Sequence, residues 1–146
     1  FGFRGDSIEC RKAGISGYLQ KPIQEKELLG IMRRVLGLSE VEHRNKTLVT
    51  RHTLRENARR HRILVAEDNA GNRALIVSLL QKWGHSVASV QNGKEVIETL
   101  DREQFDVVLM DIEMPVLDGL ETTRRIREKE RDTGRHLPII AMTAQV

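Results

Sequence analysis

The fold is decided by the stretch Phe105-Asp106-Val107-Val108-Leu109-Met110-Asp111, a short apolar run that ends in a carboxylate. Two further runs follow the same pattern: Arg62–Ala66 leads into Glu67-Asp68, and Pro138–Met142 leads into Thr143. Short apolar runs bounded by polar residues are typical of parallel strands that are buried on both faces. Ligands of open α/β sheets bind beyond the carboxyl ends of such strands. The three runs therefore predict a site at which these polar residues gather.

Helical patterns separate these runs along the chain. We expect helices near 71–83, from Gly93 through Leu100 and at about 119–131, together with a further strand over 85–90. The first of these helices places its apolar residues at one-face spacing; they are Leu75, Ile76, Leu79, Leu80 and Trp83. Alternating strands and helices with right-handed crossovers predict an α/β fold with a doubly wound parallel sheet.

The beginning of the chain repeats this pattern only in part. It suggests a helix over 6–13, one short strand over 17–20 and a helix over 25–36. The last helix has an apolar face made of Leu28, Leu29, Met32, Val35 and Leu36. A lone strand between two helices has no sheet to join, whereas strand 138–143 would end the chain as an uncovered apolar edge. We therefore predict that the two pieces complete one sheet.

Between them, residues 37–61 read as a basic linker, the least ordered stretch, with a short helix near 53–60. The net charge of +3 conceals an asymmetry, because residues 1–61 carry 13 basic and 7 acidic side chains, whereas residues 62–146 carry 11 and 14. A basic stripe could contact nucleic acid, but no aromatic residues alternate with it. We expect a solvated linker and no nucleic acid binding.

Composition sets broader limits. With 39% hydrophobic residues the chain can fill a core, and its single cysteine, Cys10, rules out an internal disulfide framework. A lone cysteine is compatible with a reducing compartment, so we expect a cytoplasmic location. Neither a run of 18 apolar residues nor a secretion signal is visible, and we expect no membrane contact by this chain, although a longer parent protein could be membrane-attached.

Longer motifs resemble a known family. Val65-Ala66-Glu67-Asp68-Asn69, Leu109-Met110-Asp111-Ile112-Glu113-Met114-Pro115-Val116-Leu117-Asp118-Gly119 and Ile140-Ala141-Met142-Thr143-Ala144 resemble the first two-thirds of a response-regulator receiver domain. Gly14-Ile15-Ser16-Gly17-Tyr18-Leu19-Gln20-Lys21-Pro22 resembles the last third. The resemblance implies a flavodoxin-like fold with five parallel strands in the order 2-1-3-4-5.

The two pieces stand in reversed order relative to the family. This order suggests the end of one receiver (1–36), the linker (37–61) and most of the next receiver (62–146), as in the tandem receivers of hybrid histidine kinases. The sheet would then be completed by circular permutation within one chain or by segment exchange between two. We expect a monomer in the first case and a segment-swapped dimer in the second.

The carboxylates of Glu67, Asp68 and Asp111 would repel one another at this site, and a bound cation would reduce the repulsion. Two like charges about 4 Å apart repel by roughly 4 kcal/mol at an effective dielectric of 20, so three acids around one crevice favour a bound cation or protonation of one member. Oxygen ligands suit Mg²⁺, with Mn²⁺ as a substitute. The resemblance implies that Asp68 and Asp111 ligate the metal directly, that Glu113 offers its backbone carbonyl and that Glu67 acts through water. The structural alternatives are that Glu67 and Asp68 are an acid pair favoured by the dipole at a helix N-terminus, and that Asp111 merely ends a strand and starts a turn.

The resemblance also assigns roles around the phosphoryl group. It implies that Asp111 is the phosphoacceptor, that Thr143 and Lys21 hold the phosphoryl oxygens, and that Thr143 and Tyr18 form the switch. Thr143 as a plain strand residue and Tyr18 as a packing residue are the structural alternatives. Whether Lys21 reaches Asp111 depends on how the pieces assemble.

The leading functional prediction is a receiver module of a phosphorelay that takes a phosphoryl group from a histidine kinase or a histidine phosphotransfer domain. Such a chain is a phosphoacceptor that dephosphorylates itself, and its parent would be a hybrid histidine kinase. One alternative is a pseudo-receiver used only for protein contacts. Another is an aspartyl-phosphate-type hydrolase, which resembles Asp-x-Asp at the nucleophile, where this sequence has Glu113.

Overall fold

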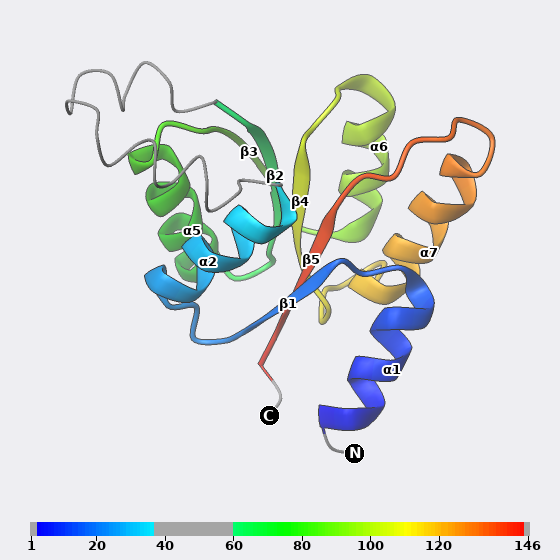
Figure 1. Ribbon diagram of the computed structural model, residues 1–146, viewed down its shortest axis with the longest axis horizontal. Coiled ribbons are helices and arrows are strands. Elements are labelled where there is room, and N and C mark those ends of the chain that lie inside the picture. The colour runs from blue at the N-terminus through cyan, green and yellow to red at the C-terminus, as the bar shows by residue number, and fades with distance from the viewer. Residues whose placement is uncertain (1–2, 37–59, 145–146) are drawn as a thin grey trace.

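The computed structural model describes residues 3–36 and 60–144 as one α/β body (Figure 1). Five parallel strands form a single sheet in the order β1-β5-β4-β2-β3. The strands are β1 (Gly17–Gln20), β2 (Arg62–Ala66), β3 (Ser86–Val90), β4 (Val107–Asp111) and β5 (Ile139–Thr143). The helices are α1 (Phe3–Ala13), α2 (Glu25–Val35), α5 (Ala70–Lys82), α6 (Gly93–Arg102) and α7 (Gly119–Glu130). This is the predicted flavodoxin-like strand order.

The N-terminal strand completes the sheet, as predicted. β1 pairs in parallel with β5 of the same chain, from Gly17 opposite Ile140 to Gln20 opposite Thr143. The ladder continues at its end, where the Lys21 N–H donates to the Thr143 carbonyl over 2.7 Å. The uncovered apolar edge expected for β5 is thus occupied by β1 within one chain. Exchange of this segment between two chains stays a prediction.

Two helical layers cover the sheet, with α2 and α5 on one face and α1, α6 and α7 on the other (Figure 1). Residues alternate along each strand between the two cores, because successive side chains of a strand point to opposite faces. On β4, Val107 and Leu109 pack toward the α2 and α5 layer, whereas Val108 and Met110 pack toward the opposite layer. Since all four are fully or almost fully buried, the continuous apolar run is explained by burial on both faces.

A second junction joins the N-terminal segment to α7 at the amino end of the sheet. The Arg127 guanidinium donates two hydrogen bonds to the Gly14 carbonyl, over 3.0 and 2.7 Å. Glu130 pairs with Arg127 at 2.7 Å and accepts a hydrogen bond of 2.8 Å from the Leu137 N–H. The junction therefore fixes the start of β1 and the approach to β5 against one helix.

Some expectations for individual residues were wrong. Leu75 was placed on the apolar face of α5, but it is 50% exposed, and the buried residues of this helix are Ile76 and Leu80. Ile31 was not placed on the apolar face of α2, yet it is buried there. Leu75 is adjacent to Ile76 on α5, and because successive residues of a helix point in directions about 100° apart, the sheet covers Ile76 and leaves Leu75 in solvent.

Residues 37–59, which make up all but the last two residues of the predicted linker, lie outside the described residues. The short helix expected near 53–60 falls almost entirely in this range. Within 3–36 and 60–144, no helix is long and apolar enough to cross a lipid bilayer.

Candidate functional site

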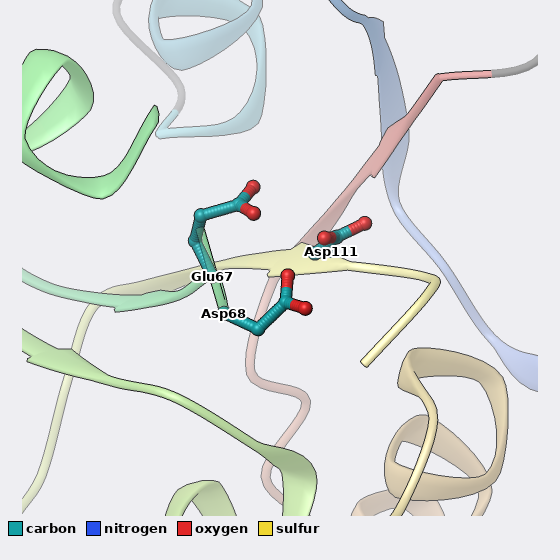
Figure 2. Close-up of side chains that lie close together, drawn as sticks. All are labelled: Glu67, Asp68 and Asp111. Carbon is teal, nitrogen blue, oxygen red and sulfur yellow. The ribbon is translucent and has the colours of Figure 1, made fainter. Parts of the chain in front are cut away.

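Three carboxylates converge at the carboxyl end of the sheet (Figure 2). Glu67 and Asp68 follow β2, and Asp111 ends the neighbouring strand β4, in which Met110 lies opposite Ala66. One oxygen from each carboxylate lies within 4.8 Å of the others. Glu67 is fully buried and Asp111 is 3% exposed, whereas Asp68 is exposed. The sheet thus brings the three predicted acids together, as neighbouring parallel strands require.

Lys21 reaches this cluster from the end of β1. Its Nζ lies 2.8 Å from Asp111 Oδ2 and 2.8 Å from Glu67 Oε2. Burial by itself lowers the pKa of Lys21, but the hydrogen bonds and the attraction of Asp111 and Glu67 outweigh burial and raise the pKa above its ordinary value. Lys21 therefore carries its positive charge between the two buried carboxylates.

Glu67 is held from two sides. Its Oε1 accepts a hydrogen bond of 3.1 Å from the Asn69 N–H, and its Oε2 faces Lys21. Burial raises the pKa of Glu67, and the contacts with Lys21 and the Asn69 N–H offset this only in part, so the pKa is higher than usual. A fully buried glutamate that needs two partners is costly to keep charged, which agrees with a role that uses its charge.

Asp111 is fixed by the loop that follows it. Its Oδ1 accepts a hydrogen bond of 3.1 Å from the Glu113 N–H, while its Oδ2 binds Lys21. The loop closes where the Gly119 N–H donates to the Ile112 carbonyl over 2.9 Å. A side chain at Gly119 would collide with the backbone carbonyl of Asp111, so glycine is required for this close approach. The carboxylate is therefore held in one orientation.

Arg73 is a residue of this region that the sequence did not reveal. Its Nη1 donates to the backbone carbonyl of Glu67 over 2.9 Å and lies 3.4 Å from that of Asp68. Asn69, which follows Asp68, caps the N-terminus of α5, because its side chain accepts a hydrogen bond of 2.9 Å from the Asn72 N–H. The cap could have been recognised from an asparagine before a helical pattern. An arginine four residues later carries no comparable signal.

The remaining predicted residues lie around the same end of the sheet. Thr143 is the last residue of β5, partly buried, and lies opposite Gln20 in the register. Tyr18 lies on β1 opposite Ala141 and is also partly buried. Glu113 is the second residue of the loop that follows Asp111. The structure therefore gathers every predicted site residue at the carboxyl end or on the strand that leads to it.

The donor set fits a small divalent cation. Of the three carboxylates of this cluster, only that of Asp68 has no hydrogen-bond or ion-pair partner among residues 3–36 and 60–144, and it is exposed to solvent beside two buried acids. The Lys21 ammonium contacts two of the three carboxylates, and negative charge remains in excess even when the Arg73 guanidinium, which binds the backbone carbonyl of Glu67, is counted. Oxygen ligands with an exposed side suit Mg²⁺, which keeps several waters when bound to proteins. The residues present therefore fit the metal that the sequence resemblance implied.

Comparisons with known proteins agree with the fold. The family model described as the response regulator receiver domain matches residues 63–146, more than half of the chain. The chain belongs to this family. The receiver is similar to Probable histidine kinase 5 of Oryza sativa subsp. japonica, with 35% identity over 162 residues that cover 97% of this chain and 13% of the rice protein. It thus spans a small part of that relative.

Two solved structures show what similar receivers bind. The receiver domain of sensor histidine kinase PA1611 from Pseudomonas aeruginosa, with a magnesium ion in its active site cleft, is 40% identical with a TM-score of 0.53, over 57% of this chain and 66% of that chain. The receiver domain of Ssk1 from Saccharomyces cerevisiae, crystallised with the histidine phosphotransfer protein Ypd1, is 30% identical with a TM-score of 0.51, over 57% and 62%. The chain is accordingly a receiver of two-component signalling.

Proposed function

We propose that this receiver accepts a phosphoryl group from phosphohistidine onto Asp111 in the presence of Mg²⁺. One observation carries the proposal: Lys21, from the N-terminal segment, meets Asp111 and Glu67 at 2.8 Å each, beside the open carboxylate of Asp68. A nucleophilic carboxylate needs positioning and charge stabilisation more than proton removal, because an ionised carboxylate has no proton to lose. This cluster supplies both.

The metal would be held by the acids. Asp68 and Asp111 would bind it directly, Glu113 would offer its backbone carbonyl and Glu67 would act through water, and Mn²⁺ would be a substitute for Mg²⁺. When bound, the ion neutralises the negative charge that the carboxylates and the incoming phosphoryl oxygens would otherwise bring together.

The transfer itself exchanges one bond for another. An oxygen of Asp111 bonds to phosphorus as the phosphorus–nitrogen bond of the phosphohistidine breaks, and the bonding electron pair returns to the imidazole. Lys21 leaves Asp111 Oδ2 for a phosphoryl oxygen, to which the Thr143 hydroxyl also donates. Movement of Thr143 opens space for the Tyr18 ring, and hydrolysis of the acyl phosphate restores the free carboxylate.

The donor is a histidine kinase or a histidine phosphotransfer domain. The complex of the Ssk1 receiver with Ypd1 supports a partner of this class. Residues 1–36 derive from a preceding receiver and residues 62–146 from the next one in a hybrid kinase. Similarity to a histidine kinase across 97% of the chain, on both sides of the linker, supports this origin.

A small phosphodonor tests the proposal without any partner protein. The chain is incubated with acetyl phosphate and Mg²⁺, and intact mass is followed for the gain of one phosphoryl group. We expect phosphorylation of the wild type, and none in Asp111→Asn or after removal of Mg²⁺. Asp118→Asn is the control, because Asp118 caps α7 through the Glu121 N–H and asparagine caps equally well.

Other outcomes separate the alternative functions. A wild-type chain that binds Mg²⁺ but never gains phosphate would be a pseudo-receiver. Sustained turnover of a phosphate monoester would indicate a hydrolase. Phosphorylation of Asp111→Asn at the wild-type rate would remove Asp111 from its proposed role.

A further inference from the structure

Val116 has an unusual backbone and an unusual environment. Among residues 3–36 and 60–144, it is the one non-glycine residue with a positive φ, 70°. Its side chain is 75% exposed, the highest value among the large apolar residues of the same ranges. A β-branched residue in the left-handed region is a genuine outlier, because its branched Cβ crowds the following carbonyl. Val116 thus combines two features that stability alone does not favour.

The strain is confined to a tight turn. The Leu117 N–H donates to the Pro115 carbonyl over 2.8 Å, which closes a three-residue turn around Val116. Turns of this size with a positive central φ are rare and strained. Hydrogen bonds on both flanks hold the loop in place, from the Gly93 N–H to the Leu117 carbonyl over 3.2 Å and from Gly119 to Ile112. The surrounding structure therefore imposes the conformation.

The valine side chain does not contribute to the core. Glycine or asparagine would adopt the same backbone with less strain, and an exposed polar residue would suit the surface as well. Strained residues that persist in a well-fixed loop cluster at functional sites. An exposed apolar side chain at a strained position therefore suggests a contact that the isolated chain does not make.

The turn lies on the rim of the phosphoacceptor site. Gly119 packs against the Asp111 carbonyl. Three residues separate Val116 from Gly119, so even an extended chain keeps the two within about 11 Å. A protein that brings a phosphohistidine to Asp111, which is only 3% exposed, must press against the loops that surround it. The Val116 turn belongs to one of these loops.

From these observations we infer that Val116 is an apolar anchor for the helical surface of a histidine phosphotransfer domain that delivers the phosphoryl group. The inference rests on the proposed function and names a contact for its partner. A few residues that become fully desolvated carry most of the binding energy of an interface. Burying an exposed valine side chain stabilises a complex by roughly 1.5 kcal/mol or more, which corresponds to about tenfold or more in affinity. The rigid turn presents the side chain without a further loss of loop entropy on binding, which favours association. A small phosphodonor needs only the polar cluster and makes no such contact.

The test compares a protein donor with a small donor. Val116→Asn keeps a residue that tolerates the left-handed backbone and removes the apolar side chain. We expect its thermal midpoint to rise by about 3 °C, because strain is relieved. Its phosphorylation by acetyl phosphate should stay within about twofold of the wild type, whereas transfer from phosphorylated yeast Ypd1 should slow by about tenfold. Higher stability with slower transfer cannot arise from misfolding.

Ile8→Asn is the matched control, because Ile8 is 54% exposed on α1, a helix that carries none of the site residues. It should accept phosphate from both donors as the wild type does. Three results would overturn the inference. They are an unchanged rate of transfer from Ypd1 to Val116→Asn, an equal slowing of transfer in Ile8→Asn, and a wild type that accepts no phosphoryl group from Ypd1. If the wild type also fails with acetyl phosphate, the proposed function fails as well, so the two failures are distinguishable.

Discussion

The two ends of the sheet both contain charged groups that join the N-terminal segment to the rest of the chain, but they differ in charge balance. At the amino end, Arg127 and Glu130 form one pair, each 14% exposed, and their remaining polar atoms bind the Gly14 carbonyl and the Leu137 N–H. At the carboxyl end, the Lys21 ammonium pairs with Glu67 and Asp111, and Asp68 adds a third carboxylate; the Arg73 guanidinium binds backbone carbonyls and does not pair with any of the three.

This difference distinguishes a structural ion pair from a binding site. A partly buried pair whose charges balance and whose hydrogen bonds are satisfied needs no ligand from solution. An excess of negative charge, with one carboxylate open to solvent, is stable only because a cation can neutralise it or because one acid is protonated. Both ends hold the segments together, and only the carboxyl end is built to change its ligands.

The largest effect should come from Lys21→Met. Removing the ammonium leaves the buried Glu67 and Asp111 without their cation, which should lower the free energy of unfolding by about 3 kcal/mol in the absence of Mg²⁺. Mg²⁺ should restore more stability to this variant than it adds to the wild type, because the ion replaces the missing charge. Urea denaturation with and without Mg²⁺ measures both. Lys26→Met, at an exposed lysine of α2, should change neither, and equal Mg²⁺ increments in Lys21→Met and the wild type would contradict the prediction.

A smaller effect is expected for Arg127→Met at the balanced end. The variant loses two hydrogen bonds to the Gly14 carbonyl and leaves Glu130 without its partner, at a cost of about 2 kcal/mol. The loss should be the same with and without Mg²⁺. Arg124→Met removes an exposed pair between α7 and Glu9 of α1 and should cost at most about 0.5 kcal/mol. A Mg²⁺-dependent loss in Arg127→Met would erase the contrast between the two ends.

Removing an acid from the unbalanced end should have the opposite sign. Asp68→Asn relieves repulsion among the three carboxylates, so without Mg²⁺ the free energy of unfolding should rise by about 0.5 kcal/mol. The same variant should bind Mg²⁺ more weakly by calorimetry, because a direct ligand is lost. Glu130→Gln, at the balanced end, should instead lower stability. A destabilised Asp68→Asn would show that the cluster is not in charge excess.

The smallest effect concerns pH at the amino end. Burial, and then the neighbouring His61, lower the pKa of His85 below its ordinary value of 6.5, which Asp106 offsets in part. The His61 N–H donates to His85 Nδ1 over 3.3 Å, a bond that requires an unprotonated nitrogen. His85 therefore binds a proton more readily in the unfolded chain than in the folded one. The contribution of neutral His85 to the stability of the fold is fully present above about pH 6.5 and is lost as pH falls through the lower pKa of the folded state. In urea denaturation at a series of pH values, His85→Gln should reduce the loss of unfolding free energy as pH falls below about 6.5. His136→Gln, a change at an exposed histidine, should leave that loss unchanged. If His85→Gln loses as much stability as the wild type over this range, another group causes the loss.

Much of the fold could be predicted from local patterns. The strands over 62–66 and 138–143 were recognised from continuous apolar runs, because parallel strands bury both faces. The strand placed over 105–110 begins at Val107, since Phe105 and Asp106 belong to its approach, where Asp106 accepts a hydrogen bond of 2.7 Å from the Arg62 N–H. Exposure of Leu75 could not be predicted, because a helix with excess apolar residues does not show which one faces solvent.

The candidate site likewise contains residues that could be predicted from the sequence and one that could not. Glu67, Asp68 and Asp111 could be predicted together, because each follows a recognisable strand and neighbouring parallel strands end side by side. Arg73 could not, because its bonds to backbone carbonyls depend on the path of the chain between β2 and α5. The roles carried over from the family remain predictions until phosphorylation is measured.

By itself, the sequence determined the elements, the acids at their ends and the parallel character of the sheet, since hydrophobic period and strand length act locally, whereas the order of the strands was implied by the family resemblance. Only the tertiary structure decided that Lys21 meets Asp111, 90 residues away in sequence, because β1 completes the edge beside β5. It also decided the backbone of Val116, since hydrogen bonds from Gly93 and Gly119 on both flanks fix that turn. Contacts between distant segments have no local signature, so the charge balance and the strain that define this site arise only when the chain is folded.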